Sequence, residues 1–531
     1  MMNSEQKVDF DVIQIGYGPV SKVSALLLDR LGWKVATFER HGEVYPLPRA
    51  VCIDHELVRV LHAAGLGALA DEVTEPAPIY RWFNAEWKEL LSIDWTAGSV
   101  SGGTEVTFVH QPKFETSLNA EIKRRANIFP FFEHECIEVS QTDDFVKVVV
   151  KDLTSEQTKT YTASYLIGAD GANSVVRESL GITRTDLGFE ADWLVVDFLL
   201  ADGLTAKDLG LIECGQFCNP KRPTTIVPGG QEDGKIWRRW EFMRLPHETK
   251  EEMVQESKVR ELLGDWIKPE QGELVRHALY SFRSLISDSW RDNRIFLAGD
   301  AAHLMPPFMG QGMCAGLRDV WNLIWKLDAV MSGRAHSEFL DTYEIERKPH
   351  IIEVIKQSMF LGSIICIPDE SEAAKRDEMY FNGEAPPPAP FPYFVGGFIQ
   401  HKDGKPKLPA GKLSPHGTVR HQRRTARYDN FVKLGNTLVI NESIDEESFS
   451  ESIKELISEN NIKTVQVADK TSADDSHISD IQGQILPFMR EHGICAMLVR
   501  PDLYIYGGAN SLGGLHELVT DFCKDMSAYF K

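Results

Sequence analysis

The chain has 531 residues, of which 43% are hydrophobic, and this is enough material for two or three domains with their own cores. Its 78 acidic residues outnumber the 57 lysines and arginines, which gives a net charge of -21. Such a surface repels phosphate backbones and anionic lipid, so the composition argues against nucleic-acid binding and against binding to a membrane surface.

The start of the chain, residues 1–10, is polar and charged and lacks the apolar centre of a signal peptide. No apolar run approaches the ~18 residues that a transmembrane helix needs. The eight cysteines include no Cys-x-x-Cys pair, and Cys214 and Cys218 have no second pair at zinc spacing. We therefore expect a cytoplasmic protein with reduced thiols and no metal site.

The first expected unit is a β-α-β motif. A strand at 11–15 leads through Gly16-Tyr-Gly18-Pro-Val-Ser21 into a helix, and the next strand covers 34–38. In such a turn the backbone amides can reach a pyrophosphate at the helix N-terminus, and Glu39 can accept hydrogen bonds from ribose hydroxyls. Ser21 replaces the third glycine of the usual pattern, yet the strand–turn–helix context favours a dinucleotide site over a structural turn.

Two later segments repeat the strand-to-turn pattern. One strand ends in Asp170-Gly171, and the stretch 294–312 joins a short apolar strand to Gly299-Asp300, a Pro-Pro pair and a Gly-x-Gly. A carboxylate at Asp300 can hold a ribityl or ribose hydroxyl while backbone N–H groups approach an anionic or electron-accepting ring. Three strand ends that serve one ligand must converge, so the stretches between them are expected to be insertions into one nucleotide-binding domain.

The rest of the chain divides by pattern. Strands at 193–200, 224–227 and 235–243, with turns at Pro228-Gly-Gly and Asp233-Gly, predict an antiparallel sheet that walls a substrate site. After Asp319 an apolar periodicity predicts one long helical stretch to about residue 360. A Pro-rich linker precedes alternating strand-like and helix-like runs, which predict a small α/β domain at the C-terminal end.

Three motifs carry a resemblance to a known family. Gly16-Tyr-Gly18-Pro, Gly168-Ala-Asp170-Gly171-Ala-Asn-Ser-Val-Val-Arg177 and Ala298-Gly-Asp300-Ala-Ala-His303 together resemble the class A flavoprotein aromatic hydroxylases, over about residues 8 to 360. This is the family of para-hydroxybenzoate hydroxylase and phenol hydroxylase. Pro48-Arg49-Ala50, His110-Gln111-Pro112 and the segment 306–319 look like 3-(3-hydroxyphenyl)propionate hydroxylase and its relatives.

The resemblance implies an α/β fold with a definite domain order. The Rossmann-like FAD-binding domain would comprise residues 8–185 and, with long helices, 281–383, and an antiparallel β-sheet substrate domain, 186–280, would be inserted into it. The linker would cover 384–399 and a thioredoxin-like α/β domain 400–531. Since that domain lacks a Cys-x-x-Cys, a dithiol redox role is not expected, and a packing or subunit-contact role is the plainer interpretation.

The resemblance also implies the activity. NADPH or NADH would reduce bound FAD, O2 would form a flavin C4a-hydroperoxide, and one oxygen would pass to a phenolic ring, with a 3-hydroxyphenylpropionate-like acid as the first candidate substrate. A larger polyketide-type aromatic substrate, another oxygenation outcome, and a flavin-binding protein without oxygenase activity on the same scaffold remain alternatives. The partner is then a small aromatic molecule, and a homodimer stays open.

Cofactor contacts carry over position by position. They fall on Gly16, Gly18, Pro19, Val20, Glu39, Arg40, Arg49, Gln111, Asp170, Asp300, Pro307, Gly310, Gln311, Gly312 and Met313. Arg177 is expected either to contact the nicotinamide cofactor or to form a surface ion pair. His303 is expected to be structural rather than a proton carrier.

The sequence does not identify the base that deprotonates a phenol. Tyr280, Arg283 and His55 are the catalytic candidates, together with polar residues of the strand at 237–242. One face of that strand carries positions 237, 239 and 241, the other carries 238, 240 and 242, and one of the two faces should line the pocket. An arginine there would suit an acidic phenol, whereas a pocket without one would favour a neutral phenol.

Overall fold

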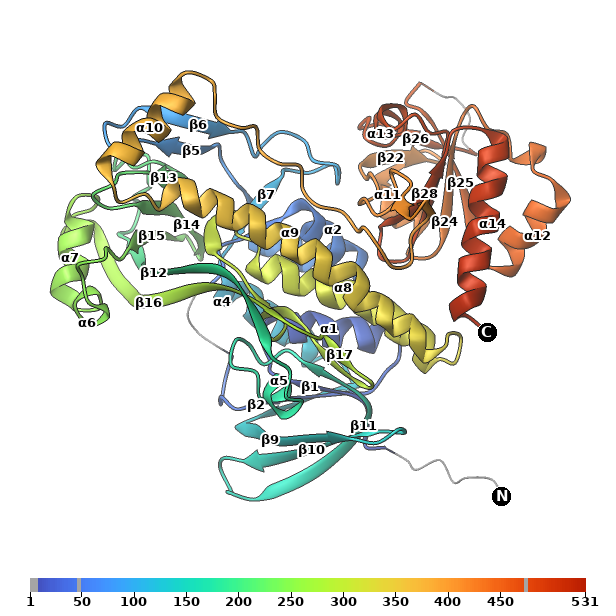
Figure 1. Cartoon of the computed structure of the whole chain (residues 1–531), viewed down its shortest axis with the longest axis horizontal. Coiled ribbons are helices and arrows are strands. Elements are labelled where there is room, and N and C mark those ends of the chain that lie inside the picture. Colours follow the sequence, from blue (N-terminus) through green and yellow to red (C-terminus); the bar gives the residue numbers. More distant parts are fainter. Residues whose placement is uncertain (1–7, 45–48, 472–475) are drawn as a thin grey trace.

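The computed structural model describes residues 8–44, 49–471 and 476–531, so Pro48 of the Pro-Arg-Ala motif lies outside the described residues. An eight-stranded sheet forms the centre of the first domain, with the order β17-β18-β11-β1-β2-β8, and β10 pairs with β11 while β9 pairs with β10 (Figure 1). Its strands are β1 (Phe10–Ile15), β2 (Val35–Glu39), β8 (Ile128–Phe132), β9 (His134–Gln141), β10 (Val146–Asp152), β11 (Thr158–Gly168), β17 (Arg291–Asp292) and β18 (Ile295–Leu297).

Three distant parts of the chain meet in this sheet. β1 pairs in parallel with β2 on one side and β11 on the other, and β11 pairs in parallel with β18. The carboxyl ends of parallel strands lie at one sheet edge, so the turns after β1, β11 and β18 come together there. The expected convergence of the three motifs is confirmed.

Helices and a small sheet cover this core. They are α1 (Pro19–Arg30), α2 (His55–Ala63), α3 (Gly67–Val73), α4 (Gln111–Ile122), α5 (Val175–Ser179), α8 (Gly312–Met331) and α9 (Asp341–Ile365), with β3 (Cys52–Asp54), β4 (Thr74–Pro76) and β7 (Val106–Val109) as the small sheet. The long helical pattern expected after Asp319 is present, and it is divided in two. The chain forms two helices, because Gly333 adopts a left-handed conformation (φ +74) just after α8 and redirects the backbone.

The second sheet has eight strands in the order β19-β16-β12-β15-β14-β13-β5-β6. These are β5 (Tyr80–Phe83), β6 (Glu89–Ile93), β12 (Arg184–Leu200), β13 (Gly215–Phe217), β14 (Thr224–Glu232), β15 (Lys235–Met243), β16 (Gly272–Ser287) and β19 (His303–Leu304). The helices α6 (Lys250–Met253) and α7 (Glu256–Gly264) lie beside its outer face, and α10 (Glu370–Phe381) lies near β6. The expected antiparallel strands are present, and β5 and β6 from earlier in the chain extend their sheet.

One expected turn in this sheet is wrong. Pro228-Gly-Gly continues β14 through a register shift between Pro228 and Gln231, while the hairpin turn lies at Asp233-Gly234, as expected. The reason is Gly230, which has a φ of +86 and brings the backbone so close to His110 that a Cβ would lie 2.7 Å from its Cβ and backbone N. The two glycines therefore form a bulge beside the first domain rather than a chain reversal.

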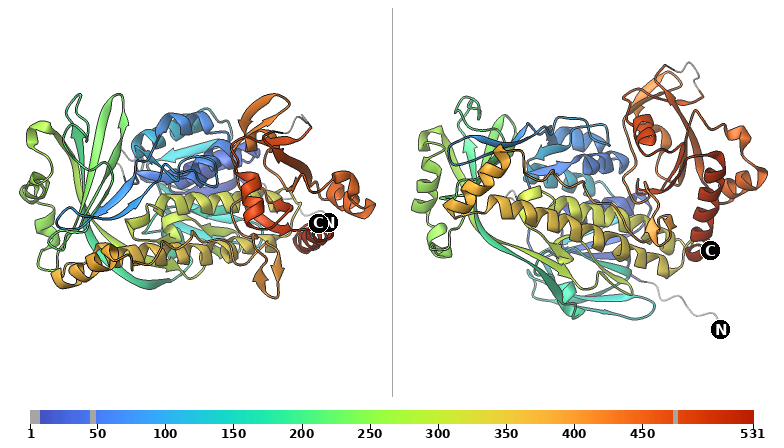
Figure 2. Two further views of the ribbon diagram at one scale, coloured as in Figure 1. Left: turned by 90° about the horizontal axis from the view of Figure 1, so that it is seen from above. Right: turned by 45° about the horizontal axis from the view of Figure 1, so that its top comes forward.

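The C-terminal domain has a seven-stranded sheet in the order β23-β22-β26-β25-β24-β27-β28. Its elements are β22 (Thr418–His421), β23 (Arg424–Arg427), β24 (Thr437–Asn441), β25 (Lys463–Asp469), β26 (Ile478–Asp480), β27 (Ala496–Val499) and β28 (Ile505–Ala509), with α11 (Tyr428–Val432), α12 (Glu451–Glu459), α13 (Ile485–Glu491) and α14 (Leu512–Tyr529). The second sheet and this domain lie at opposite ends of the molecule, and α9 runs between them (Figure 2).

The length and apolarity of a helix decide whether it could cross a lipid bilayer. Among the described residues no single helix has the length and apolarity to cross one. The segments Ser337–Ile365 and Glu370–Phe381 reach the required length and apolarity only when they are counted together, and they meet at a bend of 111°.

Candidate active site

A cavity of about 1850 Å³ lies where the parallel sheet, the second sheet and the C-terminal domain meet. The first domain contributes the turn Gly18–Val20 and the segment after β18, and the second sheet contributes the inward face of β12, β14, β15 and β16. Lys412 and Tyr504 of the C-terminal region also line it. The cavity is thus large enough for a dinucleotide and a small substrate together.

The turn after β1 places backbone N–H groups at the cavity. Gly16 has a φ of +96, and a Cβ on it would lie 2.4 Å from the carbonyl oxygen of Ala169, so only glycine fits. Gly18 is the N-cap of α1, whose first turn has no side-chain cap, and a Cβ on Gly18 would meet nothing within 4 Å. The first glycine is required by packing, and the second leaves open space in front of uncapped helical amides.

The residues at the end of β2 lie behind this turn. The carboxylate of Glu39 accepts hydrogen bonds from the backbone N–H of Tyr17 and of His41, both at 3.0 Å. Arg40 is exposed, and neither Glu39 nor Arg40 lines the cavity. The structure therefore places Glu39 against the glycine-rich turn and Arg40 on the surface beside it.

The loop after β11 is held by buried polar groups. Asp170 Oδ2 accepts a hydrogen bond from the backbone N–H of Val176 (3.2 Å), whereas its Oδ1 is buried without a partner among the described residues, and burial raises the pKa of the carboxyl. Arg177 is also buried, and its guanidinium donates to the carbonyl oxygens of Ala172 and Ala301, both at 3.1 Å. Arg177 thus ties two of the motifs together, and its guanidinium also lies 4.0 Å from the carboxylate of the exposed Glu178.

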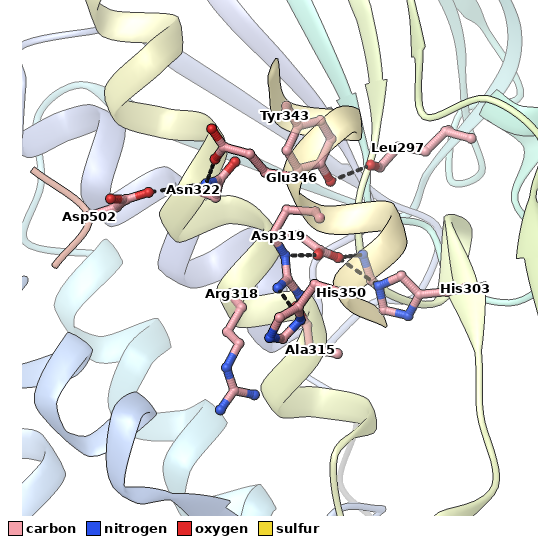
Figure 3. A network of polar contacts seen from close by, with 12 residues as sticks. Leu297, His303, Ala315, Arg318, Asp319, Asn322, Tyr343, Glu346, His350 and Asp502 are labelled. Carbon is pink, nitrogen blue, oxygen red and sulfur yellow. Dashed lines mark hydrogen bonds and ion pairs between the residues drawn. The ribbon is translucent and has the colours of Figure 1, made fainter. Parts of the chain in front are cut away.

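The segment after β18 is anchored by a buried carboxylate (Figure 3). Asp319 on α8 accepts hydrogen bonds from the N–H of Gly299 (3.0 Å) and from His303 Nε2 (2.8 Å), and its other oxygen accepts from Arg347 Nε at 3.0 Å. His303 is 2% exposed, and this burial with its bond to Asp319 is consistent with the structural role expected for it. Asp300 is open to the cavity beside this anchor, and desolvation by the surrounding protein raises the pKa of its carboxyl.

The next residues wall the cavity with backbone. Pro307 and Gly310–Met313 line it, and Gly310 has a φ of +64 with Cys52 Sγ only 2.6 Å from the position of a Cβ. The helix α8 begins at Gly312 without a side-chain cap, and a Cβ on Gly312 would meet nothing within 4 Å. A second set of uncapped helical amides therefore faces open space.

Arg49 and Gln111 meet across the cavity wall. Gln111 Oε1 accepts hydrogen bonds from the backbone N–H of Arg49 (3.1 Å) and Ala50 (2.6 Å), and its Nε2 donates to Glu115 at 2.7 Å. Glu115 in turn accepts from the fully buried Lys22 at 2.6 Å. Gln111 thereby fixes the chain around Arg49. The positive charge of Arg49 partly opposes the rise in the pKa of Asp300.

The second sheet presents a row of charges to the cavity. Asp197 on β12 pairs in register with Arg239 on β15 and with Arg276 on β16, and its carboxylate accepts from Arg239 Nε (2.7 Å) and Arg276 Nη1 (3.4 Å). Arg239 also donates to Asp197 through Nη2 and to the carbonyl oxygen of Arg49 through Nη1. All three nitrogens of the Arg239 guanidinium are therefore bonded to protein acceptors.

Glu241 lies one pleat further along β15. Its Oε1 is 3.9 Å from Arg239 Nη1, and burial, with Asp197 nearby, raises the pKa of its carboxyl although Arg239 opposes the shift. The neighbouring strands place Thr225, which donates to Gln216 Oε1 at 2.7 Å, and Tyr80, whose OH accepts from Gln216 Nε2 at 2.6 Å. The cavity face of the sheet therefore carries a carboxylate next to a short polar chain.

This arrangement decides which face of β15 lines the pocket. Arg239 and Glu241 face the cavity, and Trp237 on the same face stacks on His110 with ring centroids 4.5 Å apart. Trp240 and Phe242 point the other way, into the apolar cluster beneath α7. Alternation of the strand predicted the two faces, but only the packing of α7 decides which one is buried against a helix.

The catalytic candidates lie at different depths. Tyr280 lines the cavity, and its OH accepts a hydrogen bond from Arg276. His55 also lines it, with Nδ1 3.0 Å from Ser101 Oγ and Nε2 3.6 Å from Glu105. Arg283 stands at the rim, about half exposed, in an ion pair with Glu190 at 2.9 Å. The structure brings Tyr280 next to the charged row and keeps Arg283 away from it.

Several residues of this site carry little or no signal in the sequence. Asp197 was the detectable one, because it interrupts an otherwise apolar strand, and a buried charge in such a strand requires partners. Arg276, Gln216, Thr225 and Tyr80 gave no such signal, since polar residues alternate with apolar ones in many half-exposed strands.

The donor groups of the cavity fit FAD. Two uncapped helix N-termini over glycines without Cβ neighbours suit a pyrophosphate and an electron-rich ring edge, and the carboxylate of Asp300 suits a ribityl hydroxyl. Among the described residues, no group of three or more His, Cys, Asp or Glu side chains is arranged to hold a metal ion.

Comparison with known proteins gives the same class. Residues 9–358 match the FAD binding domain family and residues 411–525 the HcaD C-terminal domain family. A probable NADH-specific resorcinol 4-hydroxylase of Rhodococcus jostii is 32% identical over 525 residues, which cover 96% of this chain and 94% of that protein. A 3-(3-hydroxy-phenyl)propionate/3-hydroxycinnamic acid hydroxylase of Mycolicibacterium gilvum is 33% identical over 77% of this chain and 71% of its own length.

The fold has solved relatives as well. Aklavinone-11 hydroxylase, in a ternary complex with FAD and aklavinone, superposes with a TM-score of 0.77 at 21% identity over 98% of this chain and 100% of its own. The present chain belongs to the FAD binding domain family, and it is an FAD-dependent monooxygenase with an HcaD-type C-terminal domain. The expected fold class, enzyme class and cofactor are confirmed.

Proposed function

We propose that this enzyme hydroxylates a small, neutral phenol of the resorcinol type and consumes NADH. The observation that carries the proposal is the state of the charged row: each nitrogen of the Arg239 guanidinium donates to Asp197 or to the Arg49 carbonyl, and the carboxylate of Glu241 faces the cavity. An engaged guanidinium offers little to a substrate carboxylate, and Glu241 would repel one. A neutral hydroxyl can instead donate to Glu241.

The cofactor positions follow from the cavity wall. Gly18, Pro19 and Val20 would border the FAD pyrophosphate at the start of α1, with Gly16 shaping the turn and Glu39 supporting it from behind through the backbone N–H of Tyr17. Asp300, Arg49 and Gln111 would border the ribityl chain. The reactive ring would lie against Pro307, Gly310, Gln311, Gly312 and Met313. Bound FAD supplies electron transfer from NADH and activation of O2.

The protein's own task is then orientation and proton removal. We infer that Glu241 accepts the phenol proton, because its raised pKa brings the carboxylate closer to a useful basicity and because it faces the cavity. Thr225, Gln216 and Tyr80 form a hydrogen-bonded chain that can orient a second ring hydroxyl. Stacked Tyr80 and Trp95, 4.4 Å apart, add an aromatic wall that excludes water.

A phenylpropionate-type acid is the second candidate. It is favoured by the M. gilvum relative, whose name gives such a substrate, and by Arg276, which lines the same cavity. The two candidate substrates differ in their need for positive charge, because only the acid has a carboxylate that must be paired with an arginine. A substrate carboxylate at Arg276 would compete with Asp197 and with the Tyr280 hydroxyl for the guanidinium, which weakens the bonds that this arginine already makes.

The test uses the purified, FAD-loaded enzyme. Resorcinol, phenol, 3-hydroxyphenylpropionate and a polyketide-type anthracyclinone are each mixed with NADH or NADPH under labelled O2, and products are analysed by mass spectrometry. The proposal expects resorcinol to give the highest kcat/KM with NADH and one labelled oxygen in the product. A preference of more than about tenfold for 3-hydroxyphenylpropionate would transfer the proposal to the acid.

A further inference from the structure

The loop 500–504, between β27 and β28 of the C-terminal domain, is docked on the first domain. Its Leu503 has a φ of +70, a left-handed conformation that is strained for a side chain of this size. That side chain is 6% exposed and belongs to the apolar core around β1, α1 and α8 rather than to the core of its own domain. Strain persists only where surrounding contacts impose it, so this docking is a fixed feature of the fold.

Asp502 then contacts α8, and Arg500 contacts α9. Asp502 accepts hydrogen bonds from Trp321 Nε1 at its carbonyl oxygen (2.9 Å) and from Asn322 Nδ2 at its carboxylate (3.1 Å). Arg500 Nη2 donates to Glu346 Oε2 at 2.7 Å, and Lys326 donates to the same oxygen at 2.8 Å. Asn322 and Lys326 are one helical turn apart on α8, so the loop is held along one segment of α8 and, through Glu346, by α9.

Tyr504 continues this line to the cavity end of the helix. Its OH donates to Glu56 Oε1 at 2.7 Å, and Glu56 Oε2 accepts from Arg318 Nε at 2.6 Å. Arg318 Nη1 donates to Gln311 Oε1 at 2.8 Å, and its Nη2 donates to Asp54. Tyr504, Glu56 and Arg318 are 4%, 2% and 3% exposed, so each bond of the chain is shielded from water.

Gln311 is the residue immediately before α8. Because Arg318 holds its side-chain oxygen, that oxygen does not cap the helix, and α8 begins without a side-chain cap. The first amides of α8, at Gly312 and Met313, are left to face the cavity. The state of Gln311 therefore determines whether those amides are available to a bound ring.

We propose that Tyr504 is a positioning residue for the flavin: through Glu56 and Arg318, the C-terminal domain holds Gln311 away from the helix start and sets the turn that borders the reactive ring. The proposal rests on the cofactor placement given above. It assigns the HcaD-type domain a function that needs no dithiol. Loss of one buried hydrogen bond to the Glu56 carboxylate loosens Arg318 and lets Gln311 compete with the ring for the same amides.

The test compares two isosteric variants of the same strand region. Tyr504→Phe removes the bond to Glu56, and Tyr506→Phe, two residues on, removes a bond of the same kind to Asp525 (2.5 Å), which points into the C-terminal domain. Apoprotein is titrated with FAD, and flavin fluorescence, the visible absorption bands and the apoprotein Tm are recorded. We expect the FAD Kd of Tyr504→Phe to rise about tenfold, the size of one hydrogen bond to a charged group, with shifted flavin bands. We expect Tyr506→Phe to bind FAD as the wild type does.

A double variant tests the path itself. If Tyr504 acts through Arg318, Tyr504→Phe combined with Arg318→Lys should bind FAD no more weakly than Arg318→Lys alone. Equal FAD affinity in both tyrosine variants, or additive losses in the double variant, would overturn the proposal. The titration contains no substrate, so its outcome is independent of which phenol the enzyme prefers.

Discussion

At the residue scale, the site depends on which carboxylates are neutralised. Asp197 is shared by two guanidinium groups, whereas Glu241 has one arginine nitrogen at 3.9 Å and a second carboxylate nearby. Burial therefore raises the pKa of the Glu241 carboxyl above its ordinary value. Two acidic side chains on neighbouring strands thus acquire different roles from their surroundings, one as a structural counter-ion and the other as a proton acceptor.

Replacing Glu241 should expose this role. A base works when it is deprotonated, so wild-type kcat should fall as the pH drops through the raised pKa of Glu241 and should level off above it. Glu241→Gln removes the proton acceptor, so we expect kcat to fall by about 10² or more and the acid limb of the pH profile to disappear. Steady-state kinetics between about pH 5 and 8 measures both.

The matched control is Glu273→Gln, an exposed glutamate of the same sheet on β16. It should retain the wild-type kcat and the acid limb. A Glu241→Gln enzyme with an unchanged kcat and an unchanged pH profile would remove Glu241 from the mechanism and return Tyr280 and His55 to consideration.

At the element scale, the N-termini of two helices, α1 and α8, face the same ligand cavity. Before α1, Gly16 is required by packing, whereas Gly18 has open space where a Cβ would lie. Before α8, the side chain of Gln311 is held by Arg318. Each start leaves N–H groups without protein acceptors, which suits an anionic or electron-rich partner. The two glycines of the β1–α1 turn should therefore respond differently to the same substitution.

Gly18→Ala adds a methyl group where no protein atom lies within 4 Å, so we expect the apoprotein Tm to stay within ~2 °C of wild type. FAD affinity should fall at least tenfold, because the methyl group occupies the approach of the pyrophosphate. Gly16→Ala should lower both quantities, since its Cβ would lie 2.4 Å from a backbone oxygen at an unfavourable φ of +96. Calorimetry and FAD titration separate the cases, and an unstable Gly18→Ala apoprotein would contradict the assignment.

At the scale of the whole molecule, three domains are joined by buried charges rather than by apolar surface alone. Glu346 on α9 accepts hydrogen bonds from Arg500, Lys326 and Asn322, and all four side chains are essentially inaccessible to solvent. The guanidinium of Arg500 and the ammonium of Lys326 lower the pKa of Glu346 from 4.5 to about 2 despite its burial. The C-terminal domain is therefore attached through a charge that must stay ionised.

This linkage predicts the acid stability of the assembly. A folded-state pKa below the unfolded one gives a stabilisation that is present above about pH 4.5 and is lost as the pH falls towards 2. Glu346→Gln cannot titrate and leaves Lys326 and Arg500 short of an anion, so we expect a loss of about 3–5 kcal/mol at pH 7. The difference in free energy of unfolding between wild type and variant should shrink between pH 5 and about 3. A difference that stays constant over this range would contradict the pKa shift.

Much of the fold was predictable because it depends on local signals. Gly16-x-Gly18 predicted the first turn, and Asp233-Gly234 predicted the hairpin. The alternation of residues 237–242 predicted the two faces of β15. The errors arose where a distant contact overrode the local signal. Pro228-Gly-Gly has the composition of a turn, yet it forms a bulge because His110, far away in sequence, packs against Gly230.

The candidate site divides in the same way. The expected cofactor positions lie in motifs whose glycines and acidic residues are required by the backbone geometry of the turns. The class of the protein could therefore be predicted from the sequence alone. Arg283 illustrates the opposite case, because nothing local distinguishes an arginine at the rim, paired with Glu190, from Arg239 in the cavity. Burial and partners depend on strands that are dozens of residues apart.

The sequence by itself determined that the chain binds a flavin dinucleotide and carries an additional C-terminal domain, since strand–turn–helix patterns are encoded by neighbouring residues. Only the tertiary structure decided which charges meet: Asp197 with two arginines, Glu241 facing the cavity, and Tyr504 joined to α8 through Glu56 and Arg318. The physical reason is that electrostatic and hydrogen-bond energies depend on separations in space and on exclusion of water, which are fixed only when distant segments pack together.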